Sequence, residues 1–202
     1  MTTPRTELEG SIAAKGLALG SARVVYSAKI DVETEPLPSA GIPNEVKRFE
    51  GALKTARAEL ASLSERVSGA LARDLSEIID AHAMILDDPE FTDTVVALIR
   101  KEQLRATAAL KRQRDLLAEA FDAIDDPYLR ARRDDLDHVV SRVYAALARG
   151  GAEPERKPSA EGQILVCDTV APAELAQLAE TGLRGLVCTA SSPYSHTAIV
   201  AR

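Results

Sequence analysis

A run of apolar residues between positions 46 and 67 constrains the fold of this chain more than any other feature. These side chains recur at alternating spacings of three and four residues, the pattern of one face of an α-helix. The series is Val46, Phe49, Leu53, Ala56, Leu60, Leu63 and Val67. An unbroken stripe of this length predicts a long helix that packs against partner helices.

Further helix signals follow as far as residue 148. A second helix is expected from about residue 74 to 86. Pro89 and Pro127 each follow a pair of aspartates, and an aspartate N-cap before proline is a typical helix start. The aspartate pairs could also bind a metal, but capping accounts for them and we predict no metal site. Helices are expected near 89–102, 107–124 and 127–148, and Gly150 with Gly151 would close the last one. Residues 43–148 therefore predict an all-helical bundle of antiparallel hairpins.

The N-terminal flank predicts β structure. Gly10 to Gly20, followed by Ser21 to Tyr26, alternates glycines with short apolar or β-branched pieces, which is typical of one or two strands with tight turns. A proline-containing linker over 28–43 then leads into the helical zone.

The C-terminal flank predicts alternating strands and helices. Pro154 and Pro158 mark a second linker. Strands near 163–167 and 185–189, with a helix over 172–180 between them, predict a parallel pair. The loop before His196 then lies at the C-terminal ends of the strands, where ligands bind in open α/β sheets. The N-terminal strands are expected to join this sheet, so a mixed α/β domain, 1–30 and 150–202, is interrupted by the helical domain, 43–148.

Composition narrows the class of protein. The net charge is −6 and the pI about 5.2, which argues against a nucleic acid or an anionic membrane as partner. No apolar run reaches ~18 residues and no signal peptide is seen, so we expect a cytoplasmic protein. Cys167 and Cys188 lie in apolar runs without metal-like spacing, and are expected to be buried free thiols.

The segment from Ser195 to Arg202 carries the candidate chemistry. His196 stands between two hydroxyl residues at the start of an apolar, helix-like segment. A helix N-terminus favours a bound anion, and a neutral imidazole is a nucleophile that can carry a phosphoryl group. The alternative is a histidine near a helix cap that performs no chemistry.

Four stretches in order resemble Enzyme I of the bacterial phosphoenolpyruvate-dependent sugar phosphotransferase system. They are Gly10–Gly20, Asp80–Glu90, Ala171–Leu178 and Ser195–Arg202. The resemblance implies a swivelling phosphohistidine α/β domain, truncated at its C-terminus so that its sheet is incomplete, and interrupted by a helical domain that binds the carrier protein HPr. His196 would take phosphate from phosphoenolpyruvate on Nε2 and pass it to a histidine of HPr. Ser195, Thr197 and Arg202 would position the phosphoryl group.

The resemblance also implies a partner surface. The residues expected to face HPr are Asp74, Met84, Ile85, Glu90, Phe91 and Arg132. Ordinary bundle packing is the alternative for Ile85 and Phe91. We expect His82 to be a hydrogen-bonded core histidine and His138 to lie on a solvated face.

The chain departs from the family pattern near the histidine. Ser191 to Tyr194 stand where the family has Gly-Gly-x-Thr, and Leu175 stands where it commonly has a threonine that hydrogen-bonds the histidine. Paired glycines permit positive φ, which serines resist. One alternative function is therefore a non-catalytic HPr-binding module with a degraded loop. Another is the phosphohistidine domain of a dikinase or phosphoenolpyruvate synthase, although the inserted bundle favours Enzyme I.

The resemblance places phosphoenolpyruvate binding, Mg²⁺ and homodimer formation in a further barrel domain that this sequence does not contain. We therefore expect no cofactor in this fragment, which could at most exchange phosphate with phospho-HPr.

Overall fold

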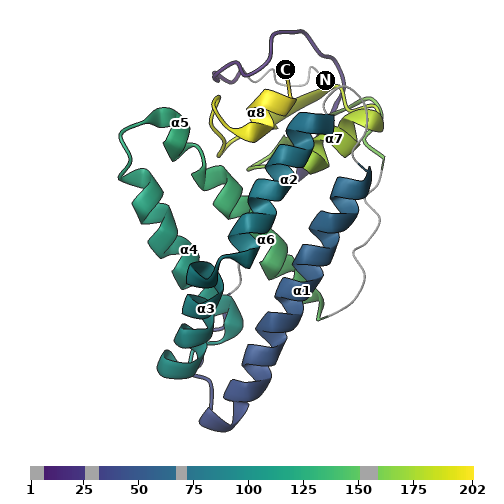
Figure 1. The fold of residues 1–202 in the computed structure, drawn as a ribbon. Helices are drawn as coiled ribbons and strands as arrows, with labels where there is room; N and C mark the ends of the chain where they lie inside the picture. The colour runs from purple at the N-terminus through teal and green to yellow at the C-terminus, as the bar shows by residue number, and fades with distance from the viewer. Residues whose placement is uncertain (1–6, 26–31, 67–71, 151–158) are drawn as a thin grey trace, which may run out of the picture.

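The computed structural model describes residues 7–25, 32–66, 72–150 and 159–202 (Figure 1). The elements in chain order are β1 (Ser21–Val25), the 3-10 helix η1 (Ser39–Gly41), α1 (Ile42–Arg66), α2 (Ala72–Asp87), α3 (Pro89–Glu102), α4 (Ala106–Asp122), α5 (Pro127–Arg130), α6 (Arg133–Arg149), β2 (Gln163–Cys167), α7 (Pro172–Glu180), β3 (Gly185–Cys188) and α8 (His196–Val200). Expectations for Tyr26, Val67, Gly151, Pro154 and Pro158 lie outside the described residues.

The apolar stripe forms the buried face of α1. Phe49 and Ala56 are completely buried, and every described member of the stripe belongs to the core of the bundle. Figure 1 shows α1 running the length of the bundle, with α2 and α6 beside it and α3 and α4 beyond them. The predicted helical bundle is therefore confirmed for the described residues.

The aspartates before the two prolines cap helices, as expected. The Asp88 carboxylate accepts a hydrogen bond from the Glu90 N–H at 2.8 Å, and that of Asp126 accepts one from the Tyr128 N–H at 2.7 Å. Gly150 ends α6 in the left-handed conformation, with φ of 59°.

The helix predicted over 127–148 is wrong in one respect, because it is broken into α5 and α6. Ala131 and Arg132 separate the two helices, each with ψ near −14°, which is typical of a turn rather than an α-helix. No glycine or proline marks this break. The bend matters because it sets the position of Arg132.

The sheet joins the two ends of the chain. Its strand order is β1-β2-β3 and both pairings are parallel, with Ser21 opposite Gln163 and Cys167 opposite Cys188. The N-terminal segment therefore joins the later sheet, as predicted. Gly20 permits this approach, since a Cβ there would lie 2.4 Å from the Gly162 carbonyl oxygen.

Only one of the predicted N-terminal strands is present in the described residues, since residues 7–20 form none. Leu8, Ile12, Leu17 and Leu19 are 79–102% exposed. Within the described residues these side chains pack into neither apolar core, and glycine-rich segments form strands poorly without apolar packing.

Helix α2 belongs to two apolar cores. Leu75 and Ile78, in its first half, pack with residues of the sheet region and α7. Ile79 and Leu86, further along, pack in the bundle core. The helical and α/β regions are therefore held together through this helix. In the described part of the chain, no helix combines the length and apolarity needed to cross a bilayer.

Candidate active site

The start of α8 presents His196. The Ser195 hydroxyl accepts a hydrogen bond from the Ala198 N–H at 3.2 Å, and Ser191 Oγ lies 3.0 Å from Ser195 Oγ. Ser195 is only 1% exposed, whereas the His196 side chain keeps 18% of its surface. The N-cap is thus buried and the imidazole remains accessible.

Two residues from α6 and the bend before it hold the imidazole. His196 Nδ1 lies 2.9 Å from Asp135 Oδ1, and Arg132 Nη1 contacts His196 Nε2. A carboxylate and a guanidinium define the ring's tautomer between them, because the first only accepts and the second only donates. Nδ1 therefore carries the hydrogen, and Nε2 keeps the lone pair that a nucleophile needs.

Asp135 is a buried anion. Its second hydrogen bond comes from His82 Nε2 at 3.3 Å. Burial alone would raise the pKa of Asp135, but the hydrogen bonds from His196 and His82 outweigh burial and hold the pKa well below its ordinary value. The prediction of His82 as a hydrogen-bonded core histidine is confirmed, and its partner is the residue that orients His196.

Arg132 lies at the imidazole, and its side chain is 19% exposed, so its place on the partner surface stays a prediction. Its guanidinium carbon is 4.3 Å from the centroid of the Tyr128 ring. Its Nη2 is buried without a hydrogen-bond partner among the described residues. A guanidinium with unused N–H groups beside an imidazole is well suited to bind phosphoryl oxygens.

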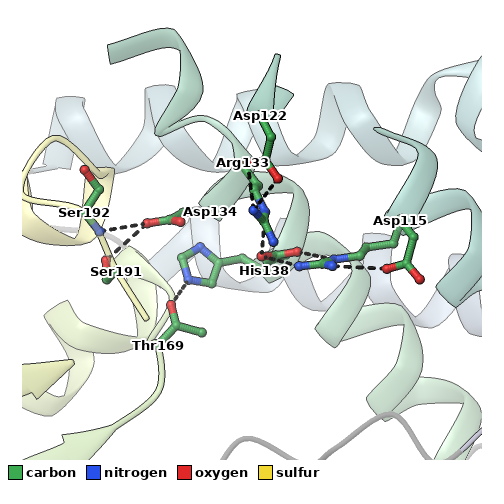
Figure 2. Close-up of polar contacts among 10 residues, drawn as sticks. Asp115, Asp122, Arg133, Asp134, His138, Thr169, Ser191 and Ser192 are labelled. Carbon is green, nitrogen blue, oxygen red and sulfur yellow. Dashed lines mark hydrogen bonds and ion pairs between the residues drawn. The ribbon is translucent and has the colours of Figure 1, made fainter. Parts of the chain in front are cut away.

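The serine-containing loop before the histidine is held by Asp134. Ser191 Oγ donates to the Asp134 carboxylate at 3.2 Å, and the Ser192 N–H donates at 3.4 Å (Figure 2). Burial raises the pKa of Asp134 despite these hydrogen bonds. Gln103 is the only described non-glycine residue with positive φ, so the serines fit this loop without the strain that their replacement of glycines suggests. Tyr194 is 55% exposed, so its bulk points to solvent.

Leu175 fills the position where a threonine was expected to bind the histidine. It is 5% exposed and packs in the core of the sheet region. Asp135 bonds the ring instead.

The sequence predicts that Ser195, Thr197 and Arg202 position the phosphoryl group. In the structure, each of these side chains forms hydrogen bonds with other residues of the chain. Thr197 Oγ1 donates to the Val170 carbonyl at 2.7 Å, and Ser195 caps α8. Arg202 Nε donates to the Ala13 carbonyl at 2.9 Å, and its Nη2 donates to that of Pro193 at 3.0 Å. In this structure these side chains build the loop and helix around His196, because buried backbone groups need partners.

The predicted partner surface is divided by burial. Asp74 and Glu90 are exposed, Met84 is 73% exposed, and Ile85 is partly buried against the bundle core. Phe91 is 2% exposed, so its prediction as a contact residue is wrong. It packs inward with the apolar face of α3.

His138 is not on a solvated face, which also corrects a prediction. It is 7% exposed, its Nε2 lies 2.9 Å from Thr169 Oγ1, and burial lowers its pKa to about 4. The burial of Asp135 and His138 could have been predicted from their positions next to the apolar stripe of α6. That stripe is formed by Leu136, Val139, Val140 and Val143.

A buried carboxylate and an arginine from the helical bundle thus meet a capped histidine beside a parallel sheet. The chain belongs to the family of PEP-utilising enzymes. Residues 9–132 match the family described as "PEP-utilising enzyme, N-terminal", and residues 159–202 match "PEP-utilising enzyme, mobile domain".

Curated relatives bear the name phosphoenolpyruvate-protein phosphotransferase. That of Cupriavidus necator is 36% identical over 205 residues, covering 96% of this chain and 35% of the relative. That of Listeria monocytogenes is 32% identical over 196 residues, covering 97% and 34%. The chain thus spans about a third of the length of these relatives.

Solved structures agree in fold. One described as the N-terminal domain of Enzyme 1 - Nitrogen has a TM-score of 0.64 at 27% identity, covering 94% of this chain and 77% of that one. A solution structure of Enzyme I (nEIt) has a TM-score of 0.69 at 24% identity, covering 94% and 76%. The prediction that this chain corresponds to the N-terminal part of Enzyme I is confirmed.

Proposed function

We propose that His196 carries a phosphoryl group on Nε2 and exchanges it with the histidine of a small carrier protein of the HPr type. The observation that carries this proposal is the orientation of the ring by the hydrogen bond from Nδ1 to Asp135. In the step, a P–N bond forms at His196 Nε2 while the P–N bond to the carrier's histidine breaks. The Nδ1 hydrogen stays on the ring and points at Asp135 throughout.

Arg132 supplies the positive charge. Its guanidinium must leave the Nε2 lone pair before phosphorus can approach, and its unpartnered Nη2 can then bind the incoming phosphoryl oxygens. Stacking on Tyr128 keeps the guanidinium near the ring during this exchange. Asp135 meanwhile stabilises the positive charge that develops on the imidazole.

The carrier is proposed to dock along α2 and across α5. Asp74 and Met84 are ten positions apart on α2, about 15 Å along the helix, a span that one small protein can cover. Glu90 extends this surface, and exposed Tyr128 and Leu129 flank Arg132. Acidic residues beside apolar ones suit a basic carrier that must bind and leave quickly.

The test uses the 202-residue chain and phospho-HPr labelled with ³²P. We expect an acid-labile, base-stable label on the wild-type chain and none on His196→Ala. If the wild-type chain binds HPr but never acquires label, the phosphotransfer proposal is wrong and the non-catalytic binding module takes its place. A parallel incubation with phosphoenolpyruvate is expected to give no label.

We assign phosphoenolpyruvate binding, Mg²⁺ and dimerisation to parts of the longer relatives that these residues do not match. The described cluster that could hold a metal contains two imidazoles and one carboxylate, whereas Mg²⁺ prefers oxygen ligands. Work with an HPr-type carrier would place this chain in the cytoplasm.

A further inference from the structure

Three buried side chains meet between α2 and α6, next to the His196 site. His82 lies on α2, and Asp135 and His138 lie on α6. One ligand atom of each lies within 4.8 Å of the other two. We propose that these residues form a binding site for a borderline first-row transition-metal dication, for which Zn²⁺ is the probe.

The helices bring the three ligands together. Asp135 and His138 are three positions apart, so they share a face of α6, and His82 reaches them from the neighbouring helix. A carboxylate and a histidine at this spacing, completed from a facing helix, is a common way in which helical bundles build metal sites. All three residues are less than a tenth exposed.

His138 gives the second, independent observation. Its Nε2 bonds to Thr169 Oγ1 at 2.9 Å (Figure 2), while its Nδ1 is buried without a hydrogen-bond partner among the described residues. Donation from Nε2–H to Thr169 leaves a lone pair on Nδ1, which is how a neighbouring group fixes the tautomer of a metal-binding histidine. A metal ion would satisfy this nitrogen, whose burial unpaired is otherwise unfavourable.

The donor set selects the metal. Two imidazoles and one carboxylate suit Zn²⁺ and related dications, and leave a further coordination position for water. To bind, His82 must place its hydrogen on Nδ1 and turn the Nε2 lone pair to the metal. No thiolate takes part in this site.

Metal binding here would compete with His196. Asp135 Oδ1 bonds both His82 and His196. A cation bound by this cluster would draw the Asp135 carboxylate away from His196 Nδ1 and neutralise part of its negative charge. We infer that Zn²⁺ slows phosphoryl exchange. This consequence rests on the proposed function, whereas metal binding itself does not.

The binding test is isothermal titration of Zn²⁺ into chelator-treated wild-type chain. We expect one tight site that is lost in both His82→Gln and His138→Gln. Thr169→Val keeps all three ligands but loses the orienting hydroxyl, and should weaken binding by ~10-fold. Asp134→Asn, one residue from Asp135, is the matched control and should bind as the wild type does.

Co²⁺ serves as an optical and paramagnetic probe that needs no variant. Paramagnetic shifts of two histidine rings, with an absorption spectrum free of thiolate charge transfer, would support the site. Binding that survives both histidine variants, or that disappears only in Cys188→Ser, would overturn it. If Zn²⁺ binds at these residues but exchange from phospho-HPr is unchanged, the inhibitory consequence fails. A wild-type chain that never acquires label defeats the proposed function and leaves the binding result standing.

Discussion

At the scale of single residues, Asp135 concentrates the chemistry of the site. It is 5% exposed, and it bonds the ring of His196 on one side and that of His82 on the other. An anion buried to this degree is stable because two imidazoles and the Arg132 guanidinium, whose Nη1 lies 3.5 Å from Asp135 Oδ2, surround it. In the proposed phosphoryl exchange its role is positioning, since Asp135 touches His196 and would act on the phosphoryl group only through that ring.

Asp135→Asn should therefore slow phosphoryl exchange by ~100-fold or more, in the range of a lost acid–base partner. The amide can donate to Nδ1 and so favours the wrong tautomer of His196. Rates with labelled phospho-HPr measure the loss, and ¹⁵N NMR of the ring reports the tautomer, which a merely structural role would not change. Asp137→Asn is the control, because Asp137 pairs with Arg114 instead. An unchanged tautomer in Asp135→Asn would contradict this role.

Arg132→Lys tests whether the guanidinium itself is needed. A lysine keeps the charge but loses the stack on Tyr128 and the second N–H group for a phosphoryl oxygen. Loss of one charge-assisted hydrogen bond predicts exchange slower by about 10-fold or more. Equal rates for Arg132→Lys and wild type would reduce Arg132 to a point charge.

The two cysteines should differ in reactivity. Their sulfur atoms are 3.9 Å apart, Cys167 is buried and Cys188 partly exposed. The hydrogen bond from Cys167 lowers the pKa of Cys188, and the same interaction raises that of Cys167. More thiolate forms on Cys188 near neutral pH, and the thiolate is the reactive form. Iodoacetamide should therefore modify Cys188 before Cys167, and should do so at a lower pH than Cys167 requires. Peptide mass spectrometry can show this order. Faster labelling of Cys167 would reverse the assignment.

At the scale of elements, the short helix α5 positions Arg132, and Asp126 starts α5. Asp126→Ala removes hydrogen bonds to the N–H groups of Tyr128 and Leu129, and should lower the free energy of unfolding by ~1 kcal/mol. Since α5 ends next to the bend, His196 should also react more slowly.

Asp88→Ala is the matched cap variant, because it removes a similar bond at α3. It should lose similar stability in a urea titration but keep full reactivity. Phosphoramidate, a small phosphoryl donor, measures that reactivity without a docking partner. Equal loss of reactivity in both variants would show that α5 has no special role.

The same elements show what the sequence could and could not predict. Asp-Pro pairs, the apolar stripe and Gly150 mark helix ends because these signals act within a few residues of the chain. The bend at Ala131 and Arg132 has no such signal. The Asp135–His196 bond joins residues 61 positions apart, so it follows only from the tertiary structure, which brings the start of α8 to the start of α6. For the same reason His138, in a charged stretch, could be read as solvated although tertiary packing buries it.

At the scale of the whole molecule, α2 couples the two apolar cores. Ile78→Val and Ile79→Val form a matched pair, since both side chains are buried, one in each core. Each should lower the free energy of unfolding by ~0.5–1.5 kcal/mol, and each should shift one shared transition.

Urea unfolding followed by circular dichroism for the helices, and by the reactivity of Cys167 for the sheet, should give coincident curves. Separate midpoints for the two probes would show that the bundle and the sheet unfold independently.

The contacts of Arg132 and Asp135 with the His196 ring limit how the two segments of this chain can evolve or be exchanged. His196 is encoded in the C-terminal α/β segment, while Arg132 and Asp135 are encoded in the helical segment. The helical bundle therefore cannot be exchanged for that of a relative without changing the surroundings of His196. Consider a chimera that keeps the α/β segment of this chain, with Leu175, and takes its helical bundle from a relative. In that relative a threonine of the α/β segment orients the histidine, so its bundle need not provide a partner for the imidazole. Unless the transplanted helix has an aspartate at position 135, the His196 imidazole of the chimera would have no hydrogen-bond partner for Nδ1.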